Sequence, residues 1–411
     1  MRIVVVANWW YRRGGLGAMM LDEAGELERR GHTVVPFAAH HPLNLPTPWS
    51  RFFVESFNTA DLGDGMSLRG KVRATARLIR NTEAARQFER LIEEAQPDLV
   101  HLHNAVRQLS PTILSVARRR GLPVLISQHD YALICPQGQL LKGDRHPCTP
   151  PNCTRGNPMP VILHRCIRGR FLPSVVAATE YGVHRARKSY SGPRPWLVAP
   201  SKFAADALRA AGFAPDRIKL VPNGVEPGGE PSAVPRGGGH FLYAGRLTRE
   251  KGLDHLLAAA ARVPELPVVI AGDGPLRTAL EARAPSSVRF VGEQTGPSLA
   301  ALRDDAVAVV SPSIWYENAP VTVLEAMRSG RPTIATRIGG QAELIADGCG
   351  IEVAPRDPDA LATAMQELWV DRDRAQRLGT AARARLMDRF TLAHHVDGLE
   401  AVYREARGGG P

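Results

Sequence analysis

The stretch HFLYAGRLTREKGLDHLLAAAARVPELPVVIAGDG, residues 240–274, contains one complete unit of the pattern that decides the fold. The apolar run over 240–246 predicts a β-strand, residues 252–263 place apolar side chains at helical spacing, and residues 267–274 predict a second strand. A helix that connects two neighbouring strands makes them parallel and covers one face of their sheet. This stretch therefore predicts a parallel sheet packed against helices.

The same alternation of strand and helix extends over most of the chain. In the first half, apolar runs predict strands at 2–8, 33–38, 98–104, 123–130, 175–182 and 196–201. In the second half, further strands are predicted at 288–293, 307–313, 331–340 and 349–355. The predicted fold class is therefore α/β, with two Rossmann-like, doubly wound parallel-sheet domains.

The length and one unusual segment indicate where the domains end. A chain of 411 residues is too long for one ordinary core. Residues 226–239 are rich in Gly and Pro and predict a linker. We therefore expect an N-terminal domain over 1–225, a C-terminal domain over 240–388 and a last segment over 389–411. Ligands of doubly wound sheets bind beyond the carboxyl ends of the strands, so we expect the site in a cleft that the two domains face.

The composition is typical of a globular protein in water, with 44% hydrophobic and 23% charged residues. No apolar run reaches the roughly 18 residues of a membrane-spanning helix, and the N-terminus lacks a signal peptide, so we expect a cytoplasmic protein. The formal net charge of +11 favours anionic partners. Residues 68–92 predict a basic amphipathic helix, which either packs its apolar side on the core or contacts the anionic inner face of a membrane.

Two loops that follow predicted strands carry features suited to phosphate. Gly14 and Gly15 lie between the first strand and a helix, where the backbone can approach an anion closely; a tight turn without a ligand is the alternative. Arg246 and Lys251 lie in the loop that leads into the helix at 252–263. Two fixed cations at the start of a helix suit a diphosphate, and two surface cations are the alternative.

The segment WYENAPVTVLEAMRSG, residues 315–330, places two carboxylates beside apolar residues. Pro320 fits the first turn of a helix, and Asn318 is predicted as the N-cap of that helix. Glu317 then lies at the helix N-terminus, and Glu325 lies on the same broad face two turns later. Carboxylates accept hydrogen bonds from sugar hydroxyls, and the N–H groups at a helix start bind phosphate or sugar oxygens. The segment therefore predicts a site for hydroxyl groups beside phosphate.

Taken together, these motifs resemble those of a known family. They are GRLTREKG at 245–252, YENAPVTVLEAMRSGRPTIATRIGGQAELI at 316–345, GGLG at 14–17 and QHDYALICPQGQLL at 128–141. The set is similar to the motifs of the retaining glycosyltransferases of the GT-B fold, family 4, and the resemblance extends over nearly the whole chain. It implies an N-terminal domain that binds the acceptor, a C-terminal domain that binds the nucleotide sugar, and a last helix that crosses back to the first domain.

The resemblance also implies the donor-binding residues. Arg246 and Lys251 look like the pair that holds the donor diphosphate and assists catalysis. Glu325 looks like the acceptor for the ribose hydroxyls, and Gly14 and Gly15 would bring the backbone of the first half close to the phosphates. The implied donor is a nucleotide-diphosphate sugar, with UDP or GDP as the nucleotide.

A second set of residues is implied to act at the transferred sugar. Glu317, with the backbone of Asn318, Ala319 and Pro320, looks like the group that grips this sugar. His129 matches the family's histidine near the reacting sugar, and a structural histidine in a loop is the alternative. The implied reaction retains the configuration of the anomeric carbon. No metal or other cofactor is then required for catalysis, because the two cations stabilise the charge on the leaving phosphate.

The implied activity is transfer of a hexosyl-type sugar to an acceptor hydroxyl in the synthesis of a polysaccharide, glycolipid or other glycoconjugate. Sugar, lipid-linked and small-molecule acceptors all stay open, and no nucleic acid is expected as a partner. One alternative is a transferase for a small natural-product acceptor. Another is a non-catalytic binder of sugar nucleotides, although a binder would not need two carboxylates and two cations together.

Four of the five cysteines lie close together in the sequence: Cys135, Cys148, Cys153 and Cys166. A cytoplasmic chain argues against disulfides, and the spacing lacks the CxxC pair of a standard zinc knuckle. The segment that carries these cysteines is rich in Pro and Gly and would gain from a metal that holds it together. A structural zinc or iron site and unligated thiols therefore both stay open.

Overall fold

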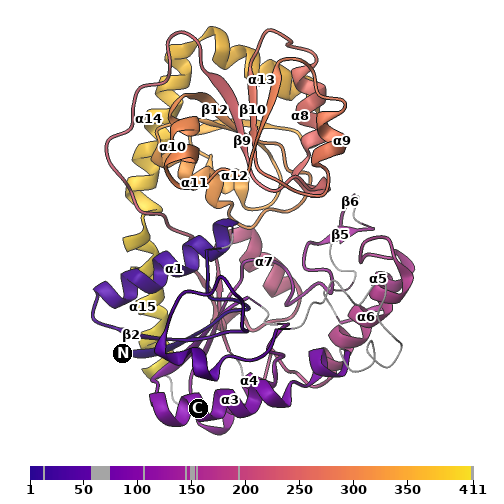
Figure 1. Cartoon of the computed structure of the whole chain (residues 1–411), viewed down its shortest axis with the longest axis vertical. Helices are drawn as coiled ribbons and strands as arrows, with labels where there is room; N and C mark the ends of the chain where they lie inside the picture. Colours follow the sequence, from indigo (N-terminus) through magenta and orange to yellow (C-terminus); the bar gives the residue numbers. More distant parts are fainter. Residues whose placement is uncertain are drawn as a thin grey trace. The chain divides into compact units, whose positions relative to one another are not determined.

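The computed structural model describes the whole chain except residues 13, 57–74, 105–106, 144–145, 149–152, 154–155, 193–194 and 409–411. The chain forms two compact units (Figure 1). The N-terminal unit consists of Met1–Val221 and Val396–Pro411, and the C-terminal unit consists of Pro222–His395. Each unit has its own parallel sheet, so the predicted pair of doubly wound α/β domains is confirmed.

Six parallel strands form the sheet of the N-terminal unit, in the order β2-β1-β3-β4-β7-β8. They are β1 (Arg2–Val6), β2 (Thr33–Phe37), β3 (Leu99–His103), β4 (Val124–Ser127), β7 (Trp196–Ala199) and β8 (Ile218–Leu220). All five side chains of β3 are buried, as a parallel sheet covered on both faces requires. The strand order reverses at β1, which pairs with both β2 and β3.

Helices and one hairpin complete the N-terminal unit. The helices are α1 (Gly14–Arg29), α3 (Thr82–Ala95), α4 (Thr112–Arg119), α5 (Met159–Leu163), α6 (Phe171–Ala186), α7 (Lys202–Ala210) and α15 (Leu392–Gly408) from Val396 onward. The hairpin is β5 (Leu141–Lys142) paired with β6 (His146–Pro147), and it is antiparallel. Leu27 of α1 and Phe88 and Leu91 of α3 are fully buried, so the apolar sides of these helices form the core together with the sheet.

The sheet of the C-terminal unit also has six parallel strands, in the order β11-β10-β9-β12-β13-β14. They are β9 (His240–Ala244), β10 (Val268–Ala271), β11 (Val288–Gly292), β12 (Ala306–Ser311), β13 (Thr333–Thr336) and β14 (Gly350–Val353). The chain runs outward from β9 to β11 and then returns to place β12 on the other side of β9. The order therefore reverses between β9 and β12, and this reversal positions the candidate site.

Helices cover both faces of the second sheet. They are α8 (Leu253–Ala260), α9 (Arg277–Glu281), α10 (Gly296–Asp304), α11 (Val321–Arg328), α12 (Gln341–Leu344), α13 (Pro358–Val370) and α14 (Arg372–Arg389). Ile334 of β13 packs with Leu256 of α8 and Met365 of α13 in one apolar cluster. Its neighbour on the strand, Ala335, packs with Leu324 of α11 in a second cluster. Alternate side chains of one strand thus reach opposite layers of helices.

Residues 175–182, predicted as a strand, lie inside helix α6. The buried residues there include Ser174, Ala177, Ala178 and Tyr181, which repeat at intervals of three and four residues. A short apolar run such as VVAA fits both the strand period and the helix period, so periodicity alone could not separate them. The strand prediction was wrong for this reason.

The single helix predicted over 68–92 is interrupted. Residues 68–74 lie outside the described residues, residues 75–79 are helical, and α3 begins only after Asn81. The side-chain oxygen of Asn81 accepts a hydrogen bond from the N–H of Ala84 at 3.0 Å, which is the geometry of an N-cap. A new helix therefore starts where one continuous helix was predicted.

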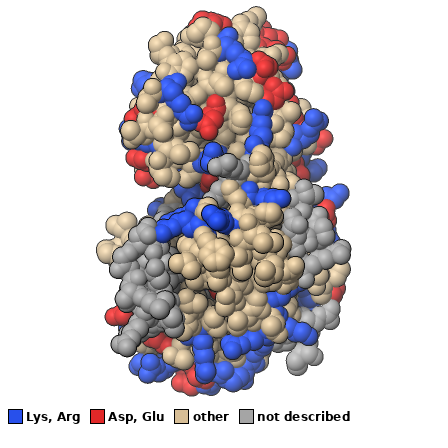
Figure 2. Space-filling model, turned by 90° about the vertical axis from the view of Figure 1, so that its right-hand side faces the viewer, with Lys and Arg blue, Asp and Glu red and all other residues tan. Residues whose placement is uncertain are grey.

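The described part of this basic segment packs on the core and carries mixed charge. Phe88 is fully buried, Arg77 pairs with Glu83 at 2.9 Å, and Arg120 of the neighbouring loop pairs with Glu89 at 3.2 Å. Basic and acidic side chains are also interspersed over the face of the C-terminal unit that Figure 2 shows. The described residues of this segment therefore pack their apolar side on the core, as in the first of the two predicted alternatives.

Residues 226–239, expected as a linker, have no helix or strand but are anchored to the C-terminal unit. Val234 is buried, and its N–H donates to the side chain of Gln376 at 2.7 Å. Arg331, which is fully buried, donates to the carbonyl oxygen of Ser232 at 2.8 Å and to its hydroxyl at 2.7 Å. These hydrogen bonds replace the regular structure that Gly and Pro prevent.

Candidate active site

Three of the predicted site residues gather at the carboxyl ends of the central strands of the C-terminal unit. Arg246 follows β9, and Lys251 ends the short 3-10 helix Arg249–Lys251. Glu317 lies in the loop after β12. Because β12 pairs directly with β9, these loops leave the sheet at its point of reversal, where doubly wound folds bind their ligands.

Lys251 and Glu317 form a buried ion pair. The Nζ of Lys251 lies 2.7 Å from Oε1 of Glu317, and the hydroxyl of Ser313 donates to the same oxygen at 2.6 Å. The two side chains are only 19% and 7% exposed. Burial by itself raises the pKa of Glu317, but the charge of Lys251 and these hydrogen bonds lower it below its ordinary value. Glu317 is therefore ionised at neutral pH.

Two glycines let the surrounding loops approach Glu317. Gly339 has a φ of +66°, and a Cβ at this position would lie 2.5 Å from the carbonyl oxygen of Glu317. The next residue, Gly340, donates its N–H to that oxygen at 2.6 Å. Gly252 has a φ of +71°, and a Cβ there would overlap the carbonyl oxygen of Pro312. A side chain at either glycine would push the loop of Glu317 away from its neighbours.

Asn318 is not the N-cap of α11, so this prediction was wrong. The N-cap position is occupied by Pro320, and no side chain caps the helix. Asn318 lies two residues too early to reach the N–H groups of the first turn. Its side chain is buried, and neither its oxygen nor its nitrogen has a hydrogen-bond partner among the described residues. An unsatisfied buried polar group costs about 1–3 kcal/mol, so a position like this one suggests a ligand.

The backbone next to Asn318 is held in place from the other side of the loop. The side chain of Asn223 donates to the carbonyl oxygen of Ala319 at 3.0 Å, and both residues are buried. Together with the hydrogen bond from Gly340, this contact fixes the loop at two points. The loop that leads into α11 is therefore rigid before any ligand binds.

Glu325 of α11 has a partner that the sequence did not indicate. The guanidinium of Arg303 on α10 lies 2.6 Å from Oε2 of Glu325. Arg303 is 4% exposed in its side chain, whereas Glu325 is 26% exposed and still reaches the surface. The ion pair fixes the direction of the Glu325 carboxylate. No local pattern could have identified Arg303, because it lies 22 residues before Glu325.

Arg246 has a fixed backbone and an extended side chain. Its carbonyl oxygen accepts a hydrogen bond from the hydroxyl of Tyr243 at 2.8 Å. Its guanidinium is 71% exposed and lies 4.0 Å from Glu250. Of the two predicted cations, Lys251 is therefore locked into a buried pair, whereas Arg246 projects into solvent.

Gly14, Gly15 and His129 belong to the N-terminal unit. Gly14 and Gly15 form the exposed start of α1, after the loop that follows β1. Gly14 has a φ of +58°, and a Cβ at this position would meet no other atom. The left-handed backbone thus favours glycine here, but the space around it does not require one. The phosphate-binding role of both glycines stays a prediction.

His129 follows β4 and is linked to a buried carboxylate through a second histidine. The Nε2 of His129 lies 3.0 Å from Nδ1 of His103, and the two rings are stacked with 5° between their planes. The Nε2 of His103 lies 3.4 Å from Oε1 of Glu23, a fully buried residue of α1. The result is a chain of contacts from Glu23 through His103 to His129.

Glu23 is ionised although it is buried. Burial raises its pKa, but His103 and His101 together lower it well below its ordinary value. His101 is held by the hydroxyl of Tyr403 at 2.8 Å and by the hydroxyl of Ser127 at 2.7 Å. The contacts through His103 therefore link this buried carboxylate to the ring of His129.

The sequence contained one signal for this network that the motifs above did not include. His101 and His103 are two residues apart on β3, so they project from the same face of the strand. Two polar residues on one face of an otherwise apolar strand indicate a buried polar cluster. Glu23 had no comparable signal, because acidic residues are common on helices.

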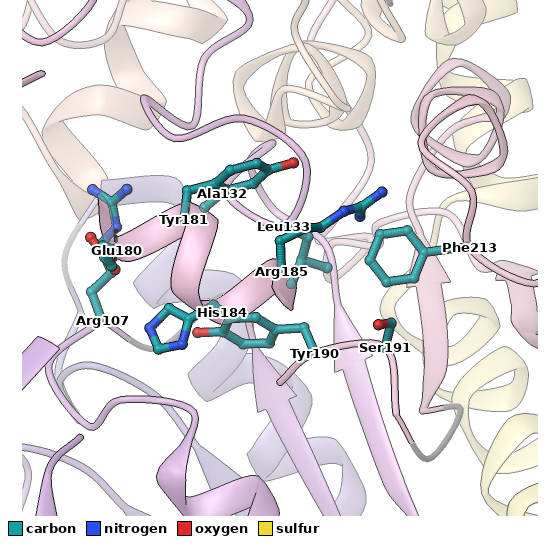
Figure 3. A pocket seen from close by; sticks show the side chains of 10 residues that line it. All are labelled: Arg107, Ala132, Leu133, Glu180, Tyr181, His184, Arg185, Tyr190, Ser191 and Phe213. Atoms are coloured by element: carbon teal, nitrogen blue, oxygen red, sulfur yellow. Dashed lines mark ion pairs between the residues drawn. The ribbon is translucent and has the colours of Figure 1, made fainter. Parts of the chain in front are cut away.

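A pocket of the N-terminal unit lies next to the segment that follows His129 (Figure 3). It is lined by Arg107, Ala132, Leu133, Glu180, Tyr181, His184, Arg185, Tyr190, Ser191 and Phe213. Figure 3 shows Arg107 and Glu180, which form an ion pair at 3.5 Å, on one side and Phe213 on the other. Aromatic rings and charged groups thus line the same pocket.

The comparisons with known proteins agree with this geometry. Residues 13–228 match the family described as Glycosyltransferase Family 4, and residues 238–371 match the family described as Glycosyl transferases group 1. The fold and the site therefore define a protein of the GT-B glycosyltransferase class. Since the first match covers more than half of the chain, the chain belongs to Glycosyltransferase Family 4.

One curated relative is glycogen synthase of Mycobacterium tuberculosis. The two sequences are 32% identical over 267 residues, which is 61% of this chain and 64% of that protein. The chain spans less than two thirds of the length of the first curated relatives that it matches. The likeness to these relatives therefore extends to the family and not to the particular reaction.

Two solved structures share the fold over nearly the whole chain. Sucrose-phosphate synthase (tll1590) from Thermosynechococcus elongatus has a TM-score of 0.71 at 19% identity, with 98% of each chain covered. HepE of Anabaena, solved in complex with UDP and glucose, has a TM-score of 0.66 at 16% identity, with 98% of this chain and 100% of that chain covered. At this level of identity the likeness supports the fold alone.

Among the helices of the described residues, none is both long enough and apolar enough to cross a membrane.

The ion pair of Glu317 gives a prediction for the pH dependence of stability. Glu317→Gln keeps the shape of the side chain but removes its charge, so the variant should be less stable at neutral pH by at most about 3–5 kcal/mol, the cost of breaking a buried pair. The folded pKa of Glu317 lies below its ordinary value of 4.5. The advantage of the wild type is therefore complete above this value and is lost as the pH falls through the folded pKa.

Melting temperatures of both proteins from neutral to acidic pH measure this effect. The wild-type and variant curves should converge toward the acid end. The matched control is Glu367→Gln, which removes a carboxylate that is 44% exposed and should change the melting temperature little at any pH. A difference between wild type and Glu317→Gln that stays constant with pH would contradict an ionised, lysine-paired Glu317.

Proposed function

We propose that this protein transfers a hexosyl-type sugar from a nucleoside-diphosphate sugar to an acceptor hydroxyl, with retention of the anomeric configuration. The observation that carries the proposal is the buried pair of Lys251 and Glu317 beside the unpartnered amide of Asn318. A fixed cation, a fixed carboxylate and an unsatisfied amide suit a ligand that combines phosphate with hydroxyl groups.

In this proposal the donor diphosphate binds to Arg246 and Lys251. The exposed guanidinium of Arg246 can fold onto the ligand and bind phosphate oxygens in a bidentate manner. The ammonium of Lys251 has three N–H donors, so it can donate to Glu317 and to a phosphate oxygen at the same time. The N–H groups at the start of α11 add partial positive charge on the same edge of the sheet.

The hydroxyl groups of the donor are proposed to bind at two places on the same loop and helix. The amide of Asn318 offers both a donor and an acceptor to the transferred sugar, next to the fixed backbone of Ala319. Glu325 would accept from the ribose hydroxyls with the oxygen that Arg303 does not hold. Asn318 lies before α11 and Glu325 lies within it, so the sugar and the nucleoside of the donor would bind at different ends of this segment.

The chemical step breaks the bond between the anomeric carbon and the oxygen of the diphosphate. The electron pair of that bond leaves with the diphosphate, and the acceptor oxygen forms the new bond on the same face of the sugar. The proton of the acceptor hydroxyl passes to an oxygen of the leaving phosphate. Arg246 and Lys251 stabilise the negative charge that grows on this phosphate, and the proposal assigns no step to a metal or another cofactor.

We further propose that His129 contacts the transferred sugar and that His103 and Glu23 act on it as positioning residues. The stacked arrangement with His103 restricts the orientation of the His129 ring. The carboxylate of Glu23 lies 3.4 Å from Nε2 of His103 and so holds the ring that orients His129. A ring held in one orientation suits a hydrogen bond to a hydroxyl of the transferred sugar.

The nucleotide is proposed to be UDP, with GDP as the second candidate. The support for UDP is the likeness of fold to HepE, which was solved in complex with UDP and glucose. The acceptor is proposed to be a carbohydrate hydroxyl of a polysaccharide, glycolipid or other glycoconjugate. The support is the pocket of Figure 3, where Tyr181, Tyr190 and Phe213 offer apolar ring faces and Arg107 offers polar groups. A small natural-product acceptor would suit the same lining and is the second candidate.

Binding and turnover assays test this function. Titration calorimetry with UDP, GDP, ADP, dTDP and CDP, without added metal, should give clear binding for UDP or GDP and much weaker binding for the others. The sugar nucleotides of the bound base should then be turned over with carbohydrate acceptors. Nuclear magnetic resonance of the product should show the same anomeric configuration as the donor.

Each part of the proposal has its own contrary result. If none of the five nucleotides binds, the donor site is wrong. If a sugar nucleotide binds tightly but is neither hydrolysed nor transferred, the protein is a binder and not an enzyme. A product with the opposite anomeric configuration would overturn retention alone.

The pair of Arg303 and Glu325 gives a prediction for donor binding. Glu325→Gln should raise the Kd for the nucleotide roughly tenfold to a hundredfold, which corresponds to the loss of a charge-assisted hydrogen bond. Arg303→Met should have a smaller effect of the same kind, because Arg303 acts only through Glu325. The double variant should be no worse than Glu325→Gln alone, as expected for two residues in one interaction.

Calorimetry with the nucleotide that the wild type binds measures these constants. Arg289→Met, at an exposed position on the edge strand β11, is the control and should bind like the wild type. Additive losses in the double variant would contradict an action of Arg303 through Glu325.

The chain from Glu23 to His129 gives a prediction for catalysis. His103→Gln should lower kcat roughly tenfold or more and leave the KM for the donor nearly unchanged. The change leaves His129 in the site but removes the contact that orients its ring. Glu23→Gln should lower kcat by a smaller factor, again with KM nearly unchanged, since Glu23 acts on His129 only through His103.

Steady-state kinetics measures kcat and KM separately for each variant. Glu28→Gln, at an exposed position of the same helix, is the matched control and should keep both constants. If Glu23→Gln lowers kcat no more than Glu28→Gln does, with the fold intact, Glu23 has a structural role only.

A further inference from the structure

Large apolar side chains are exposed together where α5 ends and α6 begins. Met159 and Leu163 of α5 are 52% and 71% exposed, and Phe171 and Leu172 of α6 are 54% and 63% exposed. The other exposed large apolar side chains of the described residues are spread over both units. Single apolar residues at a surface are ordinary, but several of them together indicate a binding surface.

The opposite side of α5 is already used by the core. Val161 is 1% exposed and packs with Cys166 and Ala178 in one apolar cluster. These thiols serve packing here, because among the described residues no three of the four clustered cysteine sulfurs lie close enough together to hold one ion. Met159 and Leu163 are four residues apart, so they lie one turn apart on the side of α5 that faces away from Val161. Their exposure therefore follows from the orientation of a packed helix.

The turn between the two helices has a fixed backbone. The hydroxyl of Ser174, which is fully buried, donates to the carbonyl oxygen of Arg170 at 2.7 Å and accepts from the N–H of Ile167 at 3.1 Å. Arg165 and Arg168 have φ angles of +45° and +52°, a backbone conformation that glycine adopts more easily. The turn thus holds arginines at positions where the backbone alone would favour glycine.

The charge of this segment has one sign. Residues 156–179 contain Arg165, Arg168 and Arg170 but no Asp or Glu. All three arginines are exposed. The exposed apolar residues therefore lie beside cations and have no carboxylate near them in the sequence.

The hairpin of β5 and β6 adds a cation beside the turn. Lys142 is exposed, and the next residue, Gly143, lies so close to the turn that a Cβ there would be 3.2 Å from the carbonyl oxygen of His164. Figure 2 views the molecule from the side on which Figure 1 shows α5 and α6. In that view the N-terminal unit has a broad uncharged area with more Lys and Arg than Asp and Glu around it.

We propose that the α5–α6 surface, which consists of the four exposed apolar residues and the three arginines, binds the surface of an anionic lipid bilayer. The apolar side chains enter the boundary between headgroups and acyl chains, and the guanidinium groups bind headgroup phosphates. A bilayer has no fixed shape, so it can receive side chains from two helix ends and a turn at the same time.

Other occupants fit this surface less well. A symmetric dimer places the same residues on both sides of its interface, so the arginines of one copy would face those of the other. Residues 156–179 offer no acidic side chain to separate these charges. An acidic protein would match the charge, but it would also need a groove shaped for the four apolar side chains.

The α5–α6 surface lies on the same helix as the pocket of Figure 3. Phe171 begins α6, and Tyr181 of this helix lines the pocket. A helix rises about 1.5 Å per residue, so these two residues lie about 15 Å apart along α6. A chain bound through this surface keeps the pocket near the headgroups, which favours a lipid-linked acceptor. This last consequence rests on the proposed function, whereas binding to the bilayer does not.

Flotation of the full chain with lipid vesicles tests the proposal. The assay contains neither donor nor acceptor, so its result does not depend on sugar transfer. The wild type should float with vesicles of equal parts phosphatidylcholine and phosphatidylglycerol and bind much less to vesicles of phosphatidylcholine alone. Binding should weaken as the salt concentration rises, because salt screens exposed guanidinium groups.

One pair of variants tests the apolar residues. Leu163→Ser combined with Phe171→Ser should lower the partition coefficient roughly tenfold or more, because these side chains supply apolar area that enters the bilayer. The matched control is Leu220→Ser combined with Val370→Ser, two residues that are 54% and 73% exposed elsewhere on the chain. The control should bind like the wild type. Both variants change exposed side chains, so their melting temperatures should stay close to that of the wild type.

A second pair of variants tests the arginines. Arg165→Gln combined with Arg168→Gln should lower the partition coefficient roughly fivefold for each arginine. The matched control is Arg377→Gln combined with Arg389→Gln, which changes two arginines of α14 with side chains that are 68% and 61% exposed. This control should also bind like the wild type.

Several results would overturn the proposal. They are absence of binding to the anionic vesicles, equal binding to neutral and anionic vesicles, and anionic binding that both surface variants keep in full. A wild-type dimer in sedimentation velocity that Leu163→Ser with Phe171→Ser separates would assign the surface to a second copy of the chain. Binding to polyglutamate without binding to vesicles would assign it to an acidic protein.

Discussion

The buried ion pair of Lys251 and Glu317 is the interaction on which the rest of the candidate site depends. A carboxylate removed from water costs several kcal/mol unless a cation and hydrogen-bond donors meet it. Lys251 and Ser313 can meet it only because the loops after β9 and β12 lie against each other, joined by the hydrogen bond from Ile314 N–H to the carbonyl oxygen of Glu250 at 2.9 Å. The strand order places β9 beside β12, so the topology creates the site and the ion pair holds the loops there.

The N-terminal unit uses the same physical device with different residues. Glu23 is also a buried, ionised carboxylate, and imidazoles take the place of the ammonium. In each unit the buried charge lies behind a group at the carboxyl edge of the sheet, Lys251 in one and His129 in the other. A charge placed behind such a group restricts its position without contacting a substrate. This arrangement explains why two acidic residues can be buried in otherwise apolar surroundings.

The sequence predicted most of the fold and part of the site. The alternation of apolar runs predicted every strand of both sheets except β8, because strand and helix periods are local properties. It failed at 175–182, where a short run fits both periods, and at Asn318, where Pro320 moved the start of α11 and left the amide without the N–H groups it was predicted to cap. The second failure is informative, because the uncapped amide is one of the groups that suggest a ligand.

The sequence by itself determined that the chain has two parallel-sheet α/β domains and that Arg246, Lys251 and Glu317 follow strands. Those features depend on neighbouring residues, whose spacing is visible in the sequence. Only the tertiary structure decided that Lys251 neutralises Glu317 and that Arg303 holds Glu325. These contacts join residues that are distant along the chain, and their formation depends on which strands lie side by side and which charges become buried. No local sequence pattern specifies which strands become neighbours, so none could have predicted that Lys251 meets Glu317 or that Arg303 meets Glu325.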